Sequence, residues 1–165
     1  MLRYLYLILL SIFIPNSLVL GSCEKFNLAH GYQPPTYRDT DSGSRIYYSY
    51  FSALEDAQEN DKLAIVVFFN PTNKDVFSHL FNTGKTSSAL STDLQSLGNV
   101  VVMQRGLISS LEYYPKMDPM TLYMADFCDR FPTLDLSQGP SIILIIIDKN
   151  GRDVIAGIRS VKVHN

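Results

Sequence analysis

The apolar run Ile142–Ile147 constrains the fold of this chain more than any other segment. It is far too short to cross a membrane, because a membrane-spanning helix needs about 20 apolar residues. A short run rich in β-branched residues is typical of a strand in the interior of a sheet. Two further runs, at 62–69 and 99–105, have the same character. The sequence therefore predicts a sheet built around interior strands.

Helical patterns separate these apolar runs. Residues 47–60 have amphipathic spacing, and Ser49 or Ser52 can cap their start. Asp118 is placed to cap another helix at 119–131, and further helical patterns lie at 74–82 and at 87–97, the latter ended by Gly98. Strands that alternate with helices pair in parallel. Asn150-Gly151 predicts a hairpin that adds a last, antiparallel strand, so we expect an α/β fold with a mixed sheet.

The first 22 residues are typical of a secretory signal peptide. Arg3 precedes the apolar run Tyr4–Ile14, and the small residues Gly21 and Ser22 mark a cleavage site; an uncleaved anchor is the alternative. Residues 23–44 are rich in Pro, Gly, Ser and Tyr and predict a flexible linker, with the folded domain at 45–165. No second long apolar segment follows, so we expect no membrane span after signal cleavage.

The two cysteines, Cys23 and Cys128, are too few for a disulfide framework. Cys128 shares an apolar helix face with Met124 and Phe131, which predicts a buried small hydrophobe. For Cys23 three alternatives are open: an unpaired thiol, a disulfide with Cys128, or the lipidated residue of "LGSC", which resembles a bacterial lipobox. The expected location is secreted or in the endoplasmic reticulum lumen, and a bacterial lipoprotein or periplasmic protein is the alternative.

The charge balance and the sequence motifs limit the classes of ligand that this chain is expected to bind. The chain has 14 Lys and Arg residues against 16 Asp and Glu, and no basic stripe, which argues against nucleic acid as a partner. Asp75 and His79 are one helical turn apart but have no third ligand nearby, so no metal is predicted, and no cofactor motif is present. Tyrosines cluster before residue 51, which favours contact with a protein or carbohydrate or, equally, cover for the sheet.

Two segments resemble the thioredoxin-like superfamily. "VVFFNPTNKDVF" is similar to the family's strand and active-site turn, and "GPSIILIIIDKNG" is similar to the segment that opens with the family's cis-proline. The resemblance covers about 47–158. It implies a three-layer fold whose mixed sheet ends in an antiparallel hairpin. It also implies a cis Gly139–Pro140 bond, with Pro140 beside the turn.

The chain departs from that family at the reactive positions. Active members carry Cys-x-x-Cys at a helix start, which lowers a thiolate pKa. Here those positions fall at Asn73 and Val76, and neither forms a thiolate. The resemblance therefore implies a redox-inactive protein that binds a protein or peptide between turn and cis-proline. The residues expected to line this site are Phe69, Pro71, Thr72, Asn73, Gly139, Pro140 and Ser141.

Two alternatives stay open at this point. One is a thiol-dependent oxidoreductase that uses Cys128 or Cys23. The other is a structural subunit of a homo-oligomer. Family members finish with a helix that packs on the sheet, whereas this chain ends in "RSVKVHN". Because residues 142–147 are apolar at every position, we expect both faces there to need cover from the 107–118 segment, the linker or a second copy.

Overall fold

The structure is a computed structural model that describes residues 33–40, 43–77, 96–108, 118–137 and 139–162. These lie in the unit Pro34–Asn165, apart from Gln33, which belongs to the unit Met1–Gln33. The predicted signal peptide and Cys23 fall outside the described residues. None of the helices in the described ranges is long and apolar enough to cross a membrane.

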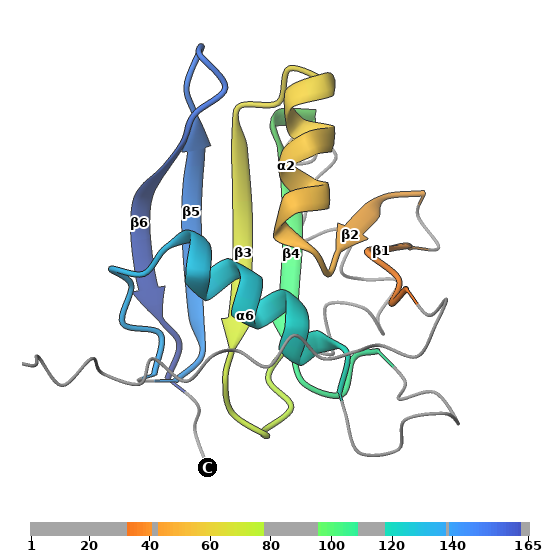
Figure 1. Ribbon diagram of the computed structural model, residues 1–165, viewed down its shortest axis with the longest axis vertical. Coiled ribbons are helices and arrows are strands. Elements are labelled where there is room, and N and C mark those ends of the chain that lie inside the picture. The colour runs from red at the N-terminus through yellow and green to blue at the C-terminus, as the bar shows by residue number, and fades with distance from the viewer. Residues whose placement is uncertain (1–32, 41–42, 78–95, 109–117, 138, 163–165) are drawn as a thin grey trace, which may run out of the picture. The chain divides into compact units, whose positions relative to one another are not determined.

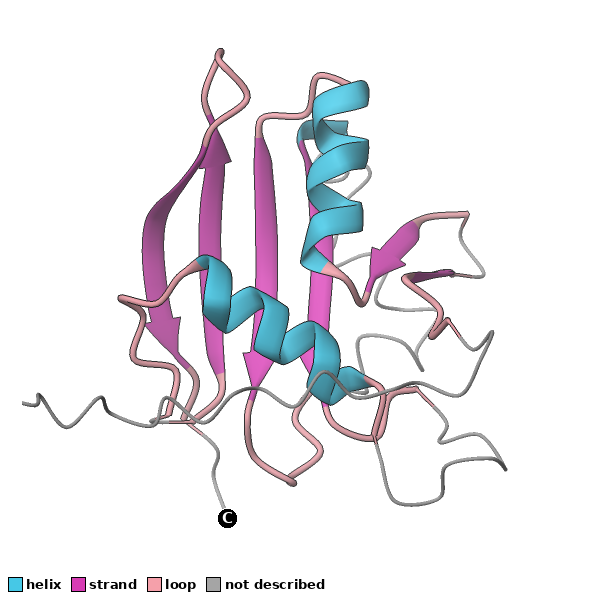
Figure 2. Cartoon of the chain, viewed as in Figure 1, coloured by secondary structure: helices cyan, strands magenta, loops and turns pink. Residues whose placement is uncertain are grey.

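The described residues form one mixed sheet of six strands (Figures 1 and 2). The strand order is β1-β2-β4-β3-β5-β6. β4 pairs in parallel with β2 and β3, whereas β5 is antiparallel to β3 and β6, and β1 is antiparallel to β2. The predicted α/β class, mixed sheet and final hairpin are thus confirmed, but the expectation that strands separated by helices pair in parallel was wrong for β5, which follows a helix and is antiparallel to β3. The strands are β1 (Tyr37–Asp39), β2 (Arg45–Tyr47), β3 (Ala64–Asn70), β4 (Gly98–Gln104), β5 (Ser141–Ile147) and β6 (Asp153–Ser160).

Two helices of the described residues, α2 (Tyr50–Glu59) and α6 (Met120–Arg130), pack on the same face of this sheet (Figure 1). Ser49 caps α2, since its side chain accepts a hydrogen bond from the Ser52 N–H at 3.4 Å. At α6 the N-cap is Pro119, which has no side-chain bond to the helix, and Asp118 just before it accepts from the Met120 N–H at 3.0 Å. We call the face under these helices the covered face.

The covered face holds the main core. Its sheet side is made of alternate strand residues such as Ile65, Val67 and Ile145, each fully buried. Rings fill the space between sheet and helices: Phe127 of α6 lies 5.2 Å from Tyr50 and 5.9 Å from Phe69, centroid to centroid. The Phe127–Tyr50 contact is edge-to-face, and such contacts add to the free energy gained from burial.

The opposite face, which we call the open face, differs along its width. Over β4 it is buried, because Val100 and Val102 pack with Phe77 and Ile46. Over β5 and β6 it is not. Leu144, Ile146 and Val154 are 41, 47 and 56 % exposed. The expectation that both faces of 142–147 need cover was therefore met on one face only, within the residues described.

The start of the domain differs from the sequence-based expectation. Tyr37–Asp39, inside the predicted flexible linker, form β1 and pair with β2. Tyr47, predicted to begin a helix, ends β2, where it pairs with Val101. The reason is pairing between distant residues: next to the Tyr37–Tyr47 pair, the Thr36 carbonyl accepts hydrogen bonds from the N–H groups of Tyr48 and Ser49, at 2.8 and 3.1 Å. The helix then begins at Tyr50.

Two other predictions about local structure were wrong. Residues 74–77 form bends rather than a helix, and the rest of the predicted helix, 78–82, lies outside the described residues. The helix predicted at 87–97, of which only 96–97 are described, does end before Gly98, but Gly98 is the first residue of β4 and not a left-handed cap. Its role is close approach, because a Cβ there would stand 2.6 Å from the Ala64 carbonyl oxygen.

Candidate binding site

The loop Pro71–Phe77 follows β3 and lies where two parallel strands end side by side. β3 and β4 run in register to their last residues, so Asn70 is opposite Gln104. The carboxyl ends of parallel strands are the edge where α/β proteins place their ligands. The two residues that end these strands are both polar and both buried, with Asn70 fully enclosed and Gln104 3 % exposed.

Asn70 fixes the first half of the loop. Its side-chain oxygen accepts hydrogen bonds from the N–H and the hydroxyl of Thr72, at 3.0 and 2.7 Å. Its Nδ2 donates to the Lys74 carbonyl at 2.7 Å. A side chain that bonds to the backbone two residues on mimics a turn and competes with helix formation. This accounts for the absence of a helix at Lys74.

Gln104 fixes the second half of the loop. Its Oε1 accepts from the N–H groups of Val76 and Phe77, at 2.9 and 2.7 Å, and from Asn70 Nδ2 at 3.1 Å. Its Nε2 donates to Asp75 Oδ1 at 2.7 Å. Two buried amides therefore bond to three backbone N–H groups, one carbonyl and two side chains of the loop, and a satisfied buried network of this kind makes a loop rigid.

The outer surface of this loop is polar. Asn73, Lys74 and Asp75 are exposed. Arg105, the residue after β4, donates from Nη1 to Asn73 Oδ1 at 3.3 Å. The next loop is also held in place, since Asp118 accepts from the Gly106 N–H at 2.8 Å as well as from the Met120 N–H at the start of α6. An exposed amide and a guanidinium thus stand together on a rigid base.

The residues predicted to line a peptide site come together only in part. Ser141 pairs with Phe69 in the sheet, so the start of β5 does lie beside the loop. However, Phe69, Pro140 and Ser141 are buried and offer little surface. Pro71, Thr72 and Gly139 are half-buried, and Asn73 is exposed.

The cis-proline prediction was wrong. None of the peptide bonds in the described ranges is cis, so the Gly139–Pro140 bond is trans. Gly139 has φ +127°, a value open to glycine, and this turns the chain into β5 without a cis bond. The Pro140 carbonyl is already occupied, because it accepts from the Val161 N–H at 2.8 Å. It is therefore not available to pair with a peptide.

The thiol Cys128 does not lie where the sequence predicted. It is exposed rather than buried, because α6 packs through Met120, Met124 and Phe127 and the next residue falls beyond that stripe. Its partial burial, and then the charge of Asp129, raise the pKa of the thiol. It is a free cysteine in the structure, and its proposed partner Cys23 lies outside the described residues.

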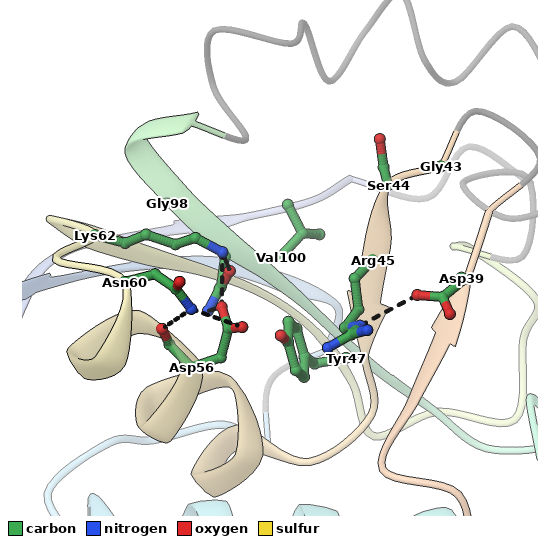
Figure 3. Close-up of a pocket in the computed structure, with 11 residues that line it drawn as sticks. Asp39, Gly43, Ser44, Arg45, Tyr47, Asp56, Asn60, Lys62, Gly98 and Val100 are labelled. Atoms are coloured by element: carbon green, nitrogen blue, oxygen red, sulfur yellow. Dashed lines mark hydrogen bonds and ion pairs between the residues drawn. The ribbon is translucent and has the colours of Figure 1, made fainter.

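A second polar region lies at the other end of β3 and β4 (Figure 3). It is a cavity of about 370 Å³ between β2, α2 and β4. Lys62 Nζ contacts Asp56 Oδ2 at 2.6 Å and Asn99 Oδ1 at 2.7 Å, while Arg45 Nε pairs with Asp39 at 3.1 Å. Burial raises the pKa of Tyr47 here to about 12. Each cation has its own carboxylate, so the cavity carries no excess charge for a ligand.

Comparison with family models, with curated proteins and with solved structures finds no match to this chain. Within the described ranges, no group of three His, Cys, Asp or Glu side chains is placed to hold a metal ion; His79 of the pair considered from sequence lies outside them. Sequence reasoning missed Asn70, Gln104 and Arg105. The available signal was a polar residue directly after each of two buried apolar runs.

Proposed function

We propose that this chain is a thioredoxin-like protein of the secretory pathway that binds a protein or peptide and lacks dithiol redox chemistry. The strand order and the final antiparallel hairpin support this kinship. One observation carries the proposal: the loop after β3 is held rigid by Asn70 and Gln104, and it presents Asn73 and Val76 where active members carry thiols. Without a thiolate, exchange with a disulfide has no nucleophile.

Recognition follows from what the loop offers. A rigid loop loses little conformational entropy on binding, so more of the contact energy appears as affinity. Arg105 uses Nη1 for Asn73, and a guanidinium has five N–H donors, so others can reach carbonyl or carboxylate oxygens of a ligand. The site is thus the exposed loop surface with Arg105, rather than a backbone edge at Pro140.

A peptide selection tests the binding role. Full-length protein is used to select from a phage-displayed library of random 12-residue peptides, and the Kd of the tightest peptide is then measured. We expect Arg105→Ala and Asn73→Ala to weaken binding about tenfold or more, as for loss of a charge-assisted hydrogen bond. Arg152→Ala, an arginine that is 75 % exposed at the other end of the sheet, is the matched control. Equal affinity in Arg105→Ala and the control would refute this site.

Two assays address the redox alternatives. Insulin reduction should proceed no faster with the protein than without it, and turnover like that of a dithiol enzyme would contradict the proposal. Because its pKa is raised, Cys128 should react slowly with a thiol reagent near neutral pH and faster as the pH rises. Fast labelling at pH 6 to 7 would favour a one-cysteine oxidoreductase instead.

The secretory location has its own test. After expression in a secreting host, N-terminal sequencing of the purified protein should begin at or near Ser22 or Cys23. A retained Met1 would contradict cleavage.

A further inference from the structure

We propose that the open face over β3, β5 and β6 docks an amphipathic helix of another protein that carries a carboxylate at one end of its apolar stripe. The surface comprises Val66, Phe68, Ile142, Leu144, Ile146 and Val154. Phe68 at its edge contacts Phe77, the last residue of the loop, at 5.4 Å between ring centroids, but the surface includes neither Asn73 nor Arg105, so its test is separate from that of the function proposed above.

Register places these side chains on one surface. Val66 pairs with Leu144, Phe68 with Ile142, and Ile146 with Val154, and directly paired residues of antiparallel strands point to the same face. Val66, Phe68 and Ile142 are half-buried, while Leu144, Ile146 and Val154 are 41 to 56 % exposed. The largest contiguous apolar patch on a protein surface is often an interaction site.

The dimensions of the surface fit one helix. The outer strands β3 and β6 are two strand spacings apart, about 10 Å, and a helix is about 10–12 Å wide with its side chains. The β5 row from Ile142 to Ile146 is about 13 Å long, the length of roughly nine helical residues. Gly157, opposite Leu144, leaves open space where a side chain would stand. A helix side chain can fill that space.

Charge selects the kind of helix and argues against a second copy. Arg159 pairs with Ile142 and therefore stands at one end of the apolar rows, where it is exposed. The carboxylate at the other end, Asp148, is already paired with Arg152 at 3.4 Å. Two copies stacked through this face would offer Arg159 no unpaired carboxylate in the described rows. A helix with an acidic residue at the matching end would provide one.

The probe is a synthetic helical peptide of 14 residues with leucines at i, i+3, i+4 and i+7 and a glutamate after the stripe. A matched peptide carries lysine in place of the glutamate. Both are titrated into the full-length protein at low salt. We expect the glutamate peptide to bind about tenfold more tightly than the lysine peptide, since like charges repel across an interface.

Variants decide which surface is used. Leu144→Gln should weaken binding at least tenfold, whereas Leu97→Gln, a leucine that is 54 % exposed outside the open face, should not. Arg159→Glu should reverse the preference between the two peptides, and it remains informative if Leu144→Gln fails to fold by circular dichroism. Unchanged preference in Arg159→Glu would overturn the proposal. So would a concentration-dependent dimer that Leu144→Gln abolishes, because the second copy would then be the occupant.

Discussion

The two faces of the sheet are made from the same strands but differ in how much of their apolar surface is buried. On the covered face, every second residue of β5 is buried beneath α2 and α6, as Ile143 and Ile145 show. On the open face, the alternate residues Leu144 and Ile146 keep much of their surface in water. The difference teaches that a run of apolar residues predicts a β-strand but does not predict whether both faces of that strand are buried. The covered face is buried along the sheet, whereas the open face is buried over β4 and exposed over β5 and β6.

A pair of adjacent isoleucines gives the largest contrast. Ile145→Ala should lower the free energy of unfolding by about 2–5 kcal/mol, because it opens a cavity in a packed core. Ile146→Ala should cost about 1 kcal/mol or less, since its side chain is already 47 % exposed. Urea titration followed by circular dichroism measures both. Similar losses in the two variants would break the comparison between the faces.

Charged groups extend the comparison to the edge strand β6. Asp153 has a side chain only 3 % exposed, and it accepts hydrogen bonds from Tyr50 at 2.7 Å and from Arg130 Nε at 3.0 Å. Asp153→Asn should cost about 3 kcal/mol, since it weakens two bonds to a buried charge. Arg159→Gln on the open face should change stability by less than about 0.5 kcal/mol. Thermal unfolding of both variants checks this, and a costly Arg159→Gln would show that the open face is already in use within the chain.

The smallest expected effect is the change in the free energy of unfolding with pH that the Asp153 carboxyl causes. Burial alone would raise the pKa of Asp153, but hydrogen bonds from Arg130 and Tyr50 more than offset this and lower it. A carboxyl with a lowered folded pKa stabilises the fold above its unfolded value of about 3.9, and the benefit disappears as pH falls through the folded pKa. Wild type should therefore lose stability below about pH 4. The loss should be shallower in Asp153→Asn, and identical acid profiles would contradict this assignment.

How much of this was predictable from sequence depends on the range of the interactions. Interior strands β3, β4 and β5 and the cap Ser49 could be found, because apolar runs and capping residues are local signals, whereas α6 has Pro119 rather than the predicted Asp118 as its N-cap. β1 and β2 could not, because each has three residues and depends on pairing with a partner strand. Sequence-based expectation also assumed that an all-apolar strand is covered on both sides.

The candidate site was less predictable than the fold. Asn70 and Gln104 are 34 positions apart, and only the parallel register of β3 and β4 brings their amides together. The positions of Asn73 and Val76 were readable from the resemblance, but the loop conformation was not, since side-chain amides replace the expected helix start. The trans bond at Pro140 and the positive φ of Gly139 are backbone features that a sequence does not reveal.

Solvent access to the two faces can be measured most directly by methyl NMR with a soluble paramagnetic agent. The account predicts strong relaxation enhancement at the methyl groups of Leu144 and Ile146 and little at those of Ile143 and Ile145. Equal protection of all four residues would contradict it, because both faces of β5 would then be covered in the free protein.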